Sequence, residues 1–141
     1  MGRRIGKSGR NTGFADRYIE TLKEAYELDP ENAKAPVYLD RIHMWYTVKG
    51  EYANSLKWAT TLLETFPKYE NREMVLESCA SMYDLHITPR DSVKVRAIYE
   101  QLINEYPLMD ADKKSGIVNR LKYNNLSFEE YILKIVDQQA N

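Results

Sequence analysis

Apolar residues recur along this chain at intervals of three and four positions, which is the spacing of one face of an α-helix. The first run is Phe14, Tyr18, Leu22, Ala25 and Leu28, and its period does not fit strand alternation. Similar runs cover residues 33–50, 52–66, 72–83, 88–106, about 110–123, and 127–136. We therefore expect an all-α chain of about seven helices, joined by short turns that make neighbouring helices antiparallel.

Polar residues mark the expected starts of several helices. Asn32 and Thr88 are placed to cap the second and fifth helices, Thr88 with a first-turn proline and with Asp91 three residues later. Ser127 and Glu130 have the spacing of a capping box before the last helix. These signals predict where the helices begin.

Glycine and proline mark the expected ends. Gly50 is placed to end the second helix in a left-handed conformation, and Pro30, Pro67 and Pro107 each follow a helical run. The three prolines are 37 and 40 residues apart, and stepping back twelve, eight or five positions from each reaches an apolar or small residue every time. This recurrence predicts stacked helix-turn-helix repeats.

Charge is distributed unevenly along the chain. The net charge is −1 over 141 residues, yet residues 1–13 carry Arg3, Arg4, Lys7 and Arg10 and no acid, which leaves −5 for the rest. The first thirteen residues have too few large apolar side chains to offset the entropy of ordering. We therefore expect a disordered basic tail over 1–13 and a helical domain over 14–141.

The repeat unit resembles the tetratricopeptide repeat. Residues 26–33, Tyr-Glu-Leu-Asp-Pro-Glu-Asn-Ala, are similar to the junction between two such repeats. One unit roughly follows the consensus at Leu39, Ile42, His43, Tyr46, Gly50, Tyr52 and Pro67. A second does so at Leu76, Cys79, Ala80, Tyr83, Tyr99 and Pro107, with about three extra residues around 86–90. The resemblance covers roughly residues 14–136 and implies a tetratricopeptide-like α-solenoid of about three degenerate repeats.

Some positions depart from the family pattern. His43 stands where the family has Gly or Ala, Ser55 stands where it has Ala, and residues 110–138 lack the pattern. The helix over 14–28 resembles the second helix of a repeat, but the glycine-rich, cationic residues before it cannot supply the first. Either the array begins with an orphan helix or, as we favour, the chain is a fragment of a longer array.

The resemblance implies that the first helix of each unit lines a concave, peptide-binding groove. Carried over residue by residue, the groove consists of Val37, Asp40, Arg41, Met44, Thr47, Met74, Glu77, Ser81 and Asp84. Met44 and Met74 would supply adaptable apolar contacts, and the acids would supply charge. Family members that hold a carboxylate-ended chaperone tail use Lys and Asn at such places, whereas Asp40 and Met44 stand here, so that activity is not expected.

Catalytic and cofactor signals are weak. Residues 6–8, Gly-Lys-Ser, match only the end of a phosphate-binding loop, and no strand precedes them. The two histidines, His43 and His86, fall in different helical units, and Cys79 has no histidine at metal-binding spacing. Asp40 and His43 share a helix face, an arrangement more typical of a structural contact than of a general base. We expect no enzyme activity, metal or cofactor.

The sequence favours a non-catalytic scaffold or adaptor that binds a protein or peptide segment. Two alternatives remain open: nucleic-acid association through the basic tail, and homo-oligomerisation through the orphan face of the first helix. A small-molecule substrate is not expected. No apolar run is long enough to span a membrane and no signal peptide is visible, so the compartment stays open between a default cytoplasm and, for a fragment, the cell envelope.

Overall fold

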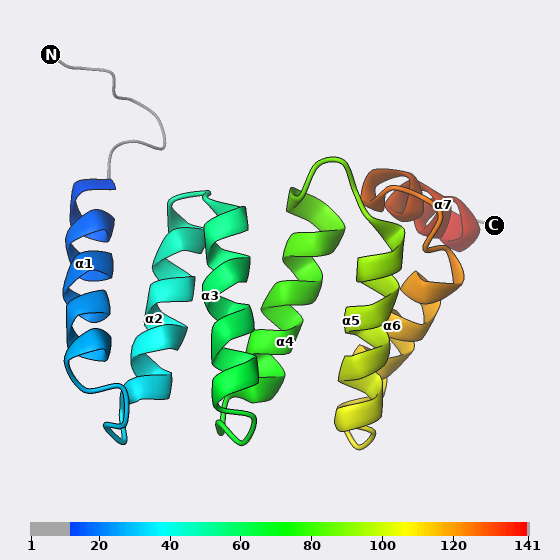
Figure 1. Cartoon of the computed structure of the whole chain (residues 1–141). Helices are drawn as coiled ribbons and strands as arrows, with labels where there is room; N and C mark the ends of the chain where they lie inside the picture. Colours follow the sequence, from blue (N-terminus) through cyan, green and yellow to red (C-terminus); the bar gives the residue numbers. More distant parts are fainter. Residues whose placement is uncertain (1–11, 141) are drawn as a thin grey trace, which may run out of the picture. The chain divides into compact units, whose positions relative to one another are not determined.

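The computed structural model describes residues 12–140, and that range is all-α (Figure 1). Its helices are α1 (Thr12–Leu28), α2 (Ala35–Val48), α3 (Tyr52–Thr65), α4 (Arg72–Ser81), a π-helical turn η2 (Met82–His86), α5 (Ser92–Glu105), α6 (Ala111–Lys122) and α7 (Phe128–Ala140). The expected helical array is confirmed in this range, which contains no strand. None of the helices described is both long enough and apolar enough to cross a membrane.

The residue contacts divide the chain into two compact units, unit 1 up to Val75 and unit 2 from Leu76 onwards. Unit 1 contains α1, α2, α3 and the start of α4. Within it, α2 packs against both α1 and α3, and consecutive helices run antiparallel (Figure 1). Unit 2 contains the rest of α4, η2, α5, α6 and α7, and there α5 packs against η2 and α6.

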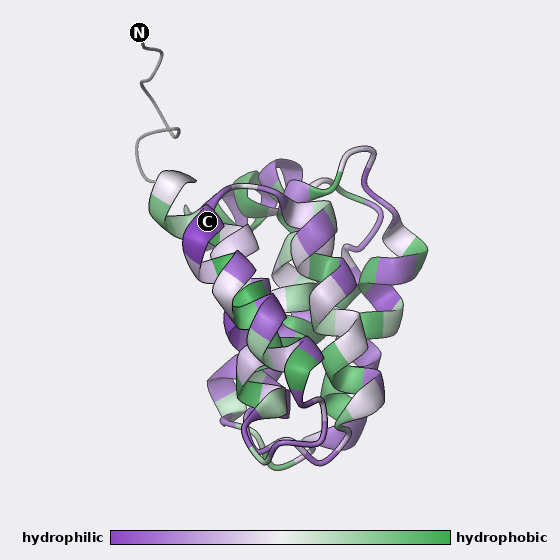
Figure 2. Cartoon of the chain, turned by 60° about the vertical axis from the view of Figure 1, so that its left-hand side comes forward, coloured by the Kyte–Doolittle hydropathy of each residue, from purple (hydrophilic) through white to green (hydrophobic). Residues whose placement is uncertain are grey.

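Each unit has an apolar core made of residues that the helical periodicity had predicted. Hydrophobic and hydrophilic residues are interspersed along the helices (Figure 2). The helical period gathers the hydrophobic ones on one side of each helix, as amphipathic packing requires. The large core side chains that are almost completely buried include Leu39, Ile42 and Leu62 in unit 1 and Leu76, Val95 and Leu102 in unit 2. Burial of each such side chain contributes about 1.5–3 kcal/mol to folding.

The repeat spacing read from the prolines is confirmed in the backbone. After α1 and after α3, three backbone hydrogen bonds recur with an offset of 37 residues, and the first two recur after α5 with a further offset of 40. The donor-to-acceptor pairs are Asp29–Ala25, Asn32–Asp29 and Ala35–Asn32; Phe66–Leu62, Tyr69–Phe66 and Arg72–Tyr69; and Tyr106–Leu102 and Met109–Tyr106. The residues Phe66 and Tyr106 also have nearly the same φ and ψ, −127° and 68° against −128° and 61°. The connections are therefore built alike.

Two predicted helix boundaries are confirmed in atomic detail. Gly50 has a φ of 77°, and Gly50 and Glu51 donate to the carbonyls of Thr47 and Tyr46, which completes a left-handed helix end. Ser127 Oγ accepts from the Glu130 amide at 3.1 Å, and the Glu130 carboxylate accepts from the Ser127 amide at 2.8 Å. This reciprocal pair is the predicted capping box.

Two predicted caps are wrong. The cap position of α2 is Lys34, while Asn32 Oδ1 accepts from the Lys34 amide within the preceding turn. The cap of α5 is Asp91, whose carboxylate accepts from the Val93 and Lys94 amides, so Thr88 lies outside the helix. In both segments an alternative polar residue a few positions away occupies the cap, which local sequence signals could not decide.

The predicted tail falls almost entirely on residues 1–11, outside the described residues. Its last two residues, Thr12 and Gly13, belong to the first turn of α1, so the helix begins two residues before the predicted start at Phe14. The helical propensity of the following residues extends the helix past Gly13, because a glycine in a first turn costs little.

The extra residues of the second repeat lie in η2 and the connection to α5. The offset between equivalent residues is 37 up to this segment and 40 after it, and η2 itself is π-helical. π-helical turns are rare, occur mostly as single turns within α-helices, and frequently lie at functional sites. Asp84 lies in η2 and Arg90 in the connection to α5, so both residues belong to this segment of unit 2.

Candidate functional site

The outward face of α2 carries part of the predicted groove. Val37, Arg41 and Met44 recur at one helical face together with Val48, which the sequence reasoning omitted, and Arg41, Met44 and Val48 are exposed. This stripe belongs to unit 1. These side chains lie outside the core, and the groove that they are expected to line stays a prediction.

Asp40 and Thr47 lie one helical turn to either side of Met44 along α2, and both side chains are engaged within unit 1. The Tyr69 hydroxyl donates to Asp40 Oδ2 at 2.6 Å, and Thr47 Oγ1 lies 2.7 Å from Ser55 Oγ on α3. Both side chains are only partly exposed. Burial and the adjacent Asp40 carboxylate raise the pKa of Tyr69. These two residues therefore serve the packing of α2 against the segments that follow it.

An aromatic pair extends the exposed stripe onto α1. The rings of Tyr18 and Trp45 are stacked with centroids 4.8 Å apart and planes inclined by 10°. Because α1 and α2 run antiparallel, Phe14, one turn before Tyr18, is brought to the end of α2 that carries Val48. We call Phe14, Tyr18, Met44, Trp45 and Val48 the aromatic face. All except Trp45, which is partly exposed, are at least half exposed.

Ionic contacts beside the aromatic face hold α1 on α2. Lys49 binds Asp16 of α1 and lies 2.8 Å from Glu51, and these hydrogen bonds raise the pKa of Lys49. Lys23 of α1 donates to the Tyr46 hydroxyl at 2.8 Å. Tyr18 and Trp45 therefore lie on two helices that several side-chain contacts hold together.

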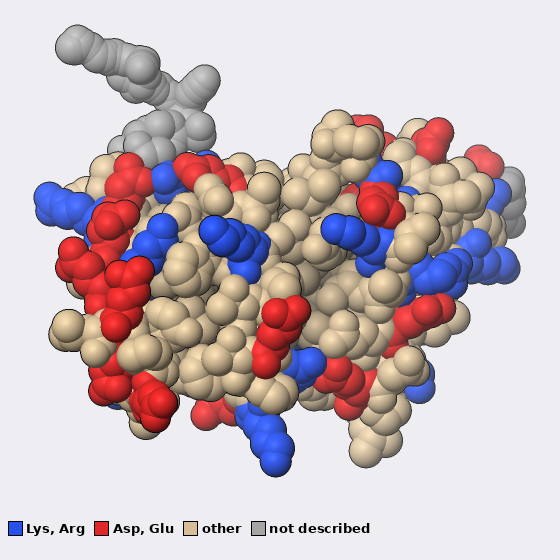
Figure 3. Space-filling view, viewed as in Figure 1, with Lys and Arg blue, Asp and Glu red and all other residues tan. Residues whose placement is uncertain are grey.

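Two arginines flank the aromatic face without a carboxylate partner among the described residues. Arg17 lies over the ring of Phe14, 6.0 Å from its centroid, and Arg41 is one helical turn before Trp45; both are exposed. Four acids lie along α1, Asp16, Glu20, Glu24 and Glu27, with Glu20 one helical turn after Arg17, and Figure 3 shows acidic side chains gathered over α1. Arg17 therefore lies close to acidic residues of α1.

Searches against protein-family models, curated proteins and solved structures return no match. Inference about function therefore depends on the geometry of the two units.

The predicted groove residues of α4 are in mixed environments. Met74 and Ser81 are exposed, whereas the Glu77 carboxylate accepts a hydrogen bond from Lys113 of α6. Asp40 and Glu77 are 37 residues apart, and each carboxylate accepts a hydrogen bond from a residue later in its own unit, Tyr69 and Lys113 respectively. Glu77 thus serves the packing of unit 2 as Asp40 serves unit 1.

The prediction that Asp84 offers a groove charge is wrong. Its side chain is buried and both carboxylate oxygens face arginines: Arg120 Nε and Nη2 donate to Oδ2 and Oδ1 at 2.9 and 2.7 Å, and Arg90 Nε donates to Oδ1 at 2.9 Å. The Tyr99 hydroxyl donates to Oδ2 at 3.2 Å. Burial by itself would raise the pKa of Asp84, but the hydrogen bonds and positive charges of Arg120 and Arg90 outweigh it, so the pKa is lowered.

The remaining donors of the two arginines are satisfied by backbone and amide oxygens. Arg90 donates to both oxygens of Asn124, at 2.6 and 2.9 Å, and Arg120 donates to the carbonyls of Tyr123 and Leu126, each at 2.9 Å. Arg120 also lies over the ring of Tyr131 of α7, 4.8 Å from its centroid. With these donors occupied by protein groups, the cluster acts as a buried joint that fixes η2, α6 and the turn before α7.

His43 and Ser55 form a second buried polar contact, between α2 and α3. His43 Nδ1 lies 2.8 Å from Ser55 Oγ, and the Ser55 hydroxyl donates to the His43 carbonyl at 2.8 Å. Burial lowers the pKa of His43, and the Asp40 charge and the Ser55 contact offset only part of that shift. Both side chains are buried, so no substrate reaches the pair. The two departures from the family pattern are therefore partners of one another.

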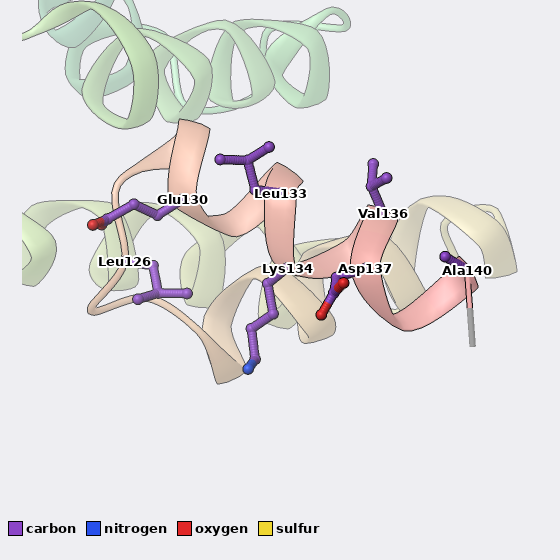
Figure 4. Close-up of a pocket in the computed structure, with 7 residues that line it drawn as sticks. All are labelled: Leu126, Glu130, Leu133, Lys134, Val136, Asp137 and Ala140. Atoms are coloured by element: carbon purple, nitrogen blue, oxygen red, sulfur yellow. The ribbon is translucent and has the colours of Figure 1, made fainter.

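A shallow apolar surface lies on α7. It is lined by Leu126, Glu130, Leu133, Lys134, Val136, Asp137 and Ala140, as Figure 4 shows. Leu133 and Val136 are exposed on the side of α7 away from Tyr131, which is buried. Among residues 12–140, no three His, Cys, Asp or Glu side chains come together as a metal site.

Proposed function

We propose that this chain is a non-catalytic interaction module that binds a segment of another protein on the aromatic face of unit 1. The observation that carries the proposal is the stacked Tyr18–Trp45 pair, in which Tyr18 is half exposed and Trp45 partly exposed, together with the exposed Phe14, Met44 and Val48. Scattered exposed apolar residues are ordinary, but a contiguous apolar and aromatic surface is typical of a binding site.

The chemistry of the face supports binding. Tyrosine and tryptophan bury a large area for little loss of side-chain entropy, and methionine adapts to varied apolar shapes. The ties between α1 and α2 through Lys49 and Lys23 hold the face in one geometry, which reduces the entropy lost on binding.

A tetratricopeptide-like relationship is part of the proposal. It is supported by the recurrence of the turn hydrogen bonds at offsets of 37 and 40 residues. In that family the outward face of each first helix contacts the ligand, and here that face of α2 carries Arg41 and Met44. Helix arrays of this kind are used widely as binding scaffolds.

The experiment is a selection of displayed random peptides of about 12 residues against the full chain, an ample length for an extended or helical segment on one helix face. Enriched peptides are expected to lose affinity by at least about tenfold on Met44→Glu, because a charge is placed in the apolar contact. The matched control is Leu133→Glu on α7, which alters another exposed apolar residue, in unit 2.

Retained affinity in Leu133→Glu together with loss in Met44→Glu supports the proposal, provided that both variants keep the thermal midpoint of the parent. Peptides that bind the parent and Met44→Glu equally would overturn it, and so would a selection without enrichment.

A further inference from the structure

We infer that the partner segment is a basic amphipathic helix that lies along α1, with its apolar residues on α1 and with lysine or arginine along one flank. The inference rests on the proposed function and extends the binding site from the aromatic face along α1. Two observations carry it. An exposed row of apolar and small residues runs along α1, and beside it lies a row of acids that form no ion pair within residues 12–140.

One exposed side of α1 has the residue spacing of a surface that packs against a second helix. At intervals of four, three, four and three residues it carries Phe14, Tyr18, Thr21, Ala25 and Leu28, which we call the α1 stripe. Ala25 is partly exposed and the other four are exposed. A repeat that averages 3.5 residues is typical of two helices packed along their length, so the α1 stripe favours a helical partner over an extended one.

The α1 stripe is hollowed towards its C-terminal end. Its central residues, Thr21 and Ala25, are small, and larger side chains stand before and after them. A surface pocket is found here, lined by Thr21, Glu24, Ala25, Glu27 and Leu28. A large apolar side chain of a packed helix inserts between the side chains of the facing helix in this way. Because two of the lining residues are glutamates, the apolar contact lies directly beside negative charge.

A row of glutamates flanks the α1 stripe on the side away from α2. Ala15 and Ile19 are buried where α1 packs against α2. The helical period places Glu20, Glu24 and Glu27 beyond the opposite edge of the stripe. All three are exposed, and none of them forms an ion pair within residues 12–140. A basic side chain of the partner therefore gains an attraction that this part of the chain does not supply.

The cations nearby restrict where the partner is basic. Arg17 lies at the start of the stripe, over the ring of Phe14, and Arg41 belongs to α2, across the stripe from the glutamates. Lys23, the one base within residues 20–27, donates to a hydroxyl of α2. Charge complementarity thus selects a helix with lysine or arginine on the flank that faces the three glutamates, over a helix with acids there.

The test uses two synthetic helical peptides with the same leucine stripe and one variable flank, which carries lysines in one peptide and glutamates in the other. Binding to the full chain is measured by fluorescence anisotropy at low and high salt. The lysine peptide is expected to bind at least about tenfold more tightly at low salt, with a smaller difference at high salt. Glu24→Lys/Glu27→Lys should reverse the preference. Glu64→Lys/Glu70→Lys changes the net charge equally at exposed acids outside the site and should keep it.

A second pair of variants tests whether the partner lies along α1. Leu28→Ser removes an apolar side chain at the end of the stripe farthest from Phe14 and should weaken binding of the lysine peptide several-fold. Leu108→Ser is the matched control, because Leu28 and Leu108 are 89% and 96% exposed and each lies close to a proline at a helix end. It should leave the affinity unchanged. An unchanged affinity in Leu28→Ser would overturn the placement along α1.

Equal binding of both peptides, lost in Met44→Glu, would overturn the basic helix and leave the proposed function standing. A preference for the glutamate peptide, or binding of neither peptide, would also overturn this inference, while the peptide selection judges the proposed function separately. A parent that sediments as two chains and a Phe14→Ser variant that sediments as one would identify a second copy as the occupant and would likewise overturn it.

Discussion

Asp84 and Arg120 form a two-point ion pair inside unit 2, with Arg120 Nε and Nη2 at 2.9 and 2.7 Å from the two carboxylate oxygens. The residues are 36 positions apart and both are buried. A second guanidinium, that of Arg90, shares the same carboxylate. The pair joins the inserted π-helical turn to α6, so its loss should be felt throughout unit 2.

Removing one partner of this pair should strongly destabilise the protein. We expect Arg120→Met to lower the free energy of unfolding by about 3–5 kcal/mol, because it leaves a buried carboxylate without its main partner. Urea denaturation followed by circular dichroism measures the loss. The matched control is Arg96→Met: Arg96 pairs with Glu100 on the exposed side of α5, and its loss should cost less than about 1 kcal/mol. Similar losses in both variants would contradict the role given to the buried pair.

His43 should make stability dependent on pH near neutrality. Its folded-state pKa is lowered below 6.5, so the unfolded chain takes up a proton first as the pH falls. The contribution is therefore fully present above about pH 6.5 and declines below it, until His43 protonates in the folded state as well. Urea denaturation at pH 8, 6 and 5 measures the decline.

The two histidines allow a direct comparison. His86→Gln alters the exposed histidine at the end of η2 and should preserve the decline, whereas His43→Gln should flatten it. A parent-like slope in His43→Gln would assign the pH dependence to other groups.

Two glycines should respond in opposite directions to alanine. Gly50→Ala should cost about 1–2 kcal/mol, because Gly50 has a φ of 77° and a side chain is strained there. Gly116→Ala should instead stabilise by about 0.5–1 kcal/mol, since Gly116 is exposed inside α6 and an added Cβ meets no atom within 4 Å. Thermal or urea unfolding of the two variants measures both changes. A shift of the same sign in both would be inconsistent with this difference in backbone conformation.

Cys79 should be chemically inert in the folded chain. It is buried in α4, and burial raises the pKa of its thiol to about 12. At pH 8 its reaction with a thiol reagent should be at least about a hundredfold slower in the native protein than in urea. A chain carrying Cys79→Ser and Ser81→Cys moves the thiol to an exposed position of the same helix and should react quickly without urea. Rapid native labelling of Cys79 would show that unit 2 opens readily.

Sequence signals predicted a helix boundary correctly where the residues that determine the boundary are close together in the chain. The capping box of Ser127 and Glu130, the left-handed Gly50 and the ends of α1, α3 and α5 before prolines each depend on atoms within a few positions. The start of α5 was not decided in this way, because Thr88 and Asp91 are both acceptable caps. Arg90 is drawn into the contact with Asp84 and Asn124, and the helix starts after it.

The sequence by itself determined the all-α class, the helix positions and the repeat spacing, because helical periodicity and chain-breaking residues act over one or two turns. Only the tertiary structure decided which polar residues of a helix remain exposed. Asp84 shares a predicted face with Met44 and Met74 by repeat offset, yet Arg120, 36 residues later, buries it. Tyr18 and Trp45 likewise become one surface only through the packing of α1 on α2. Burial and pairing depend on groups distant in sequence, whose meeting no local pattern encodes.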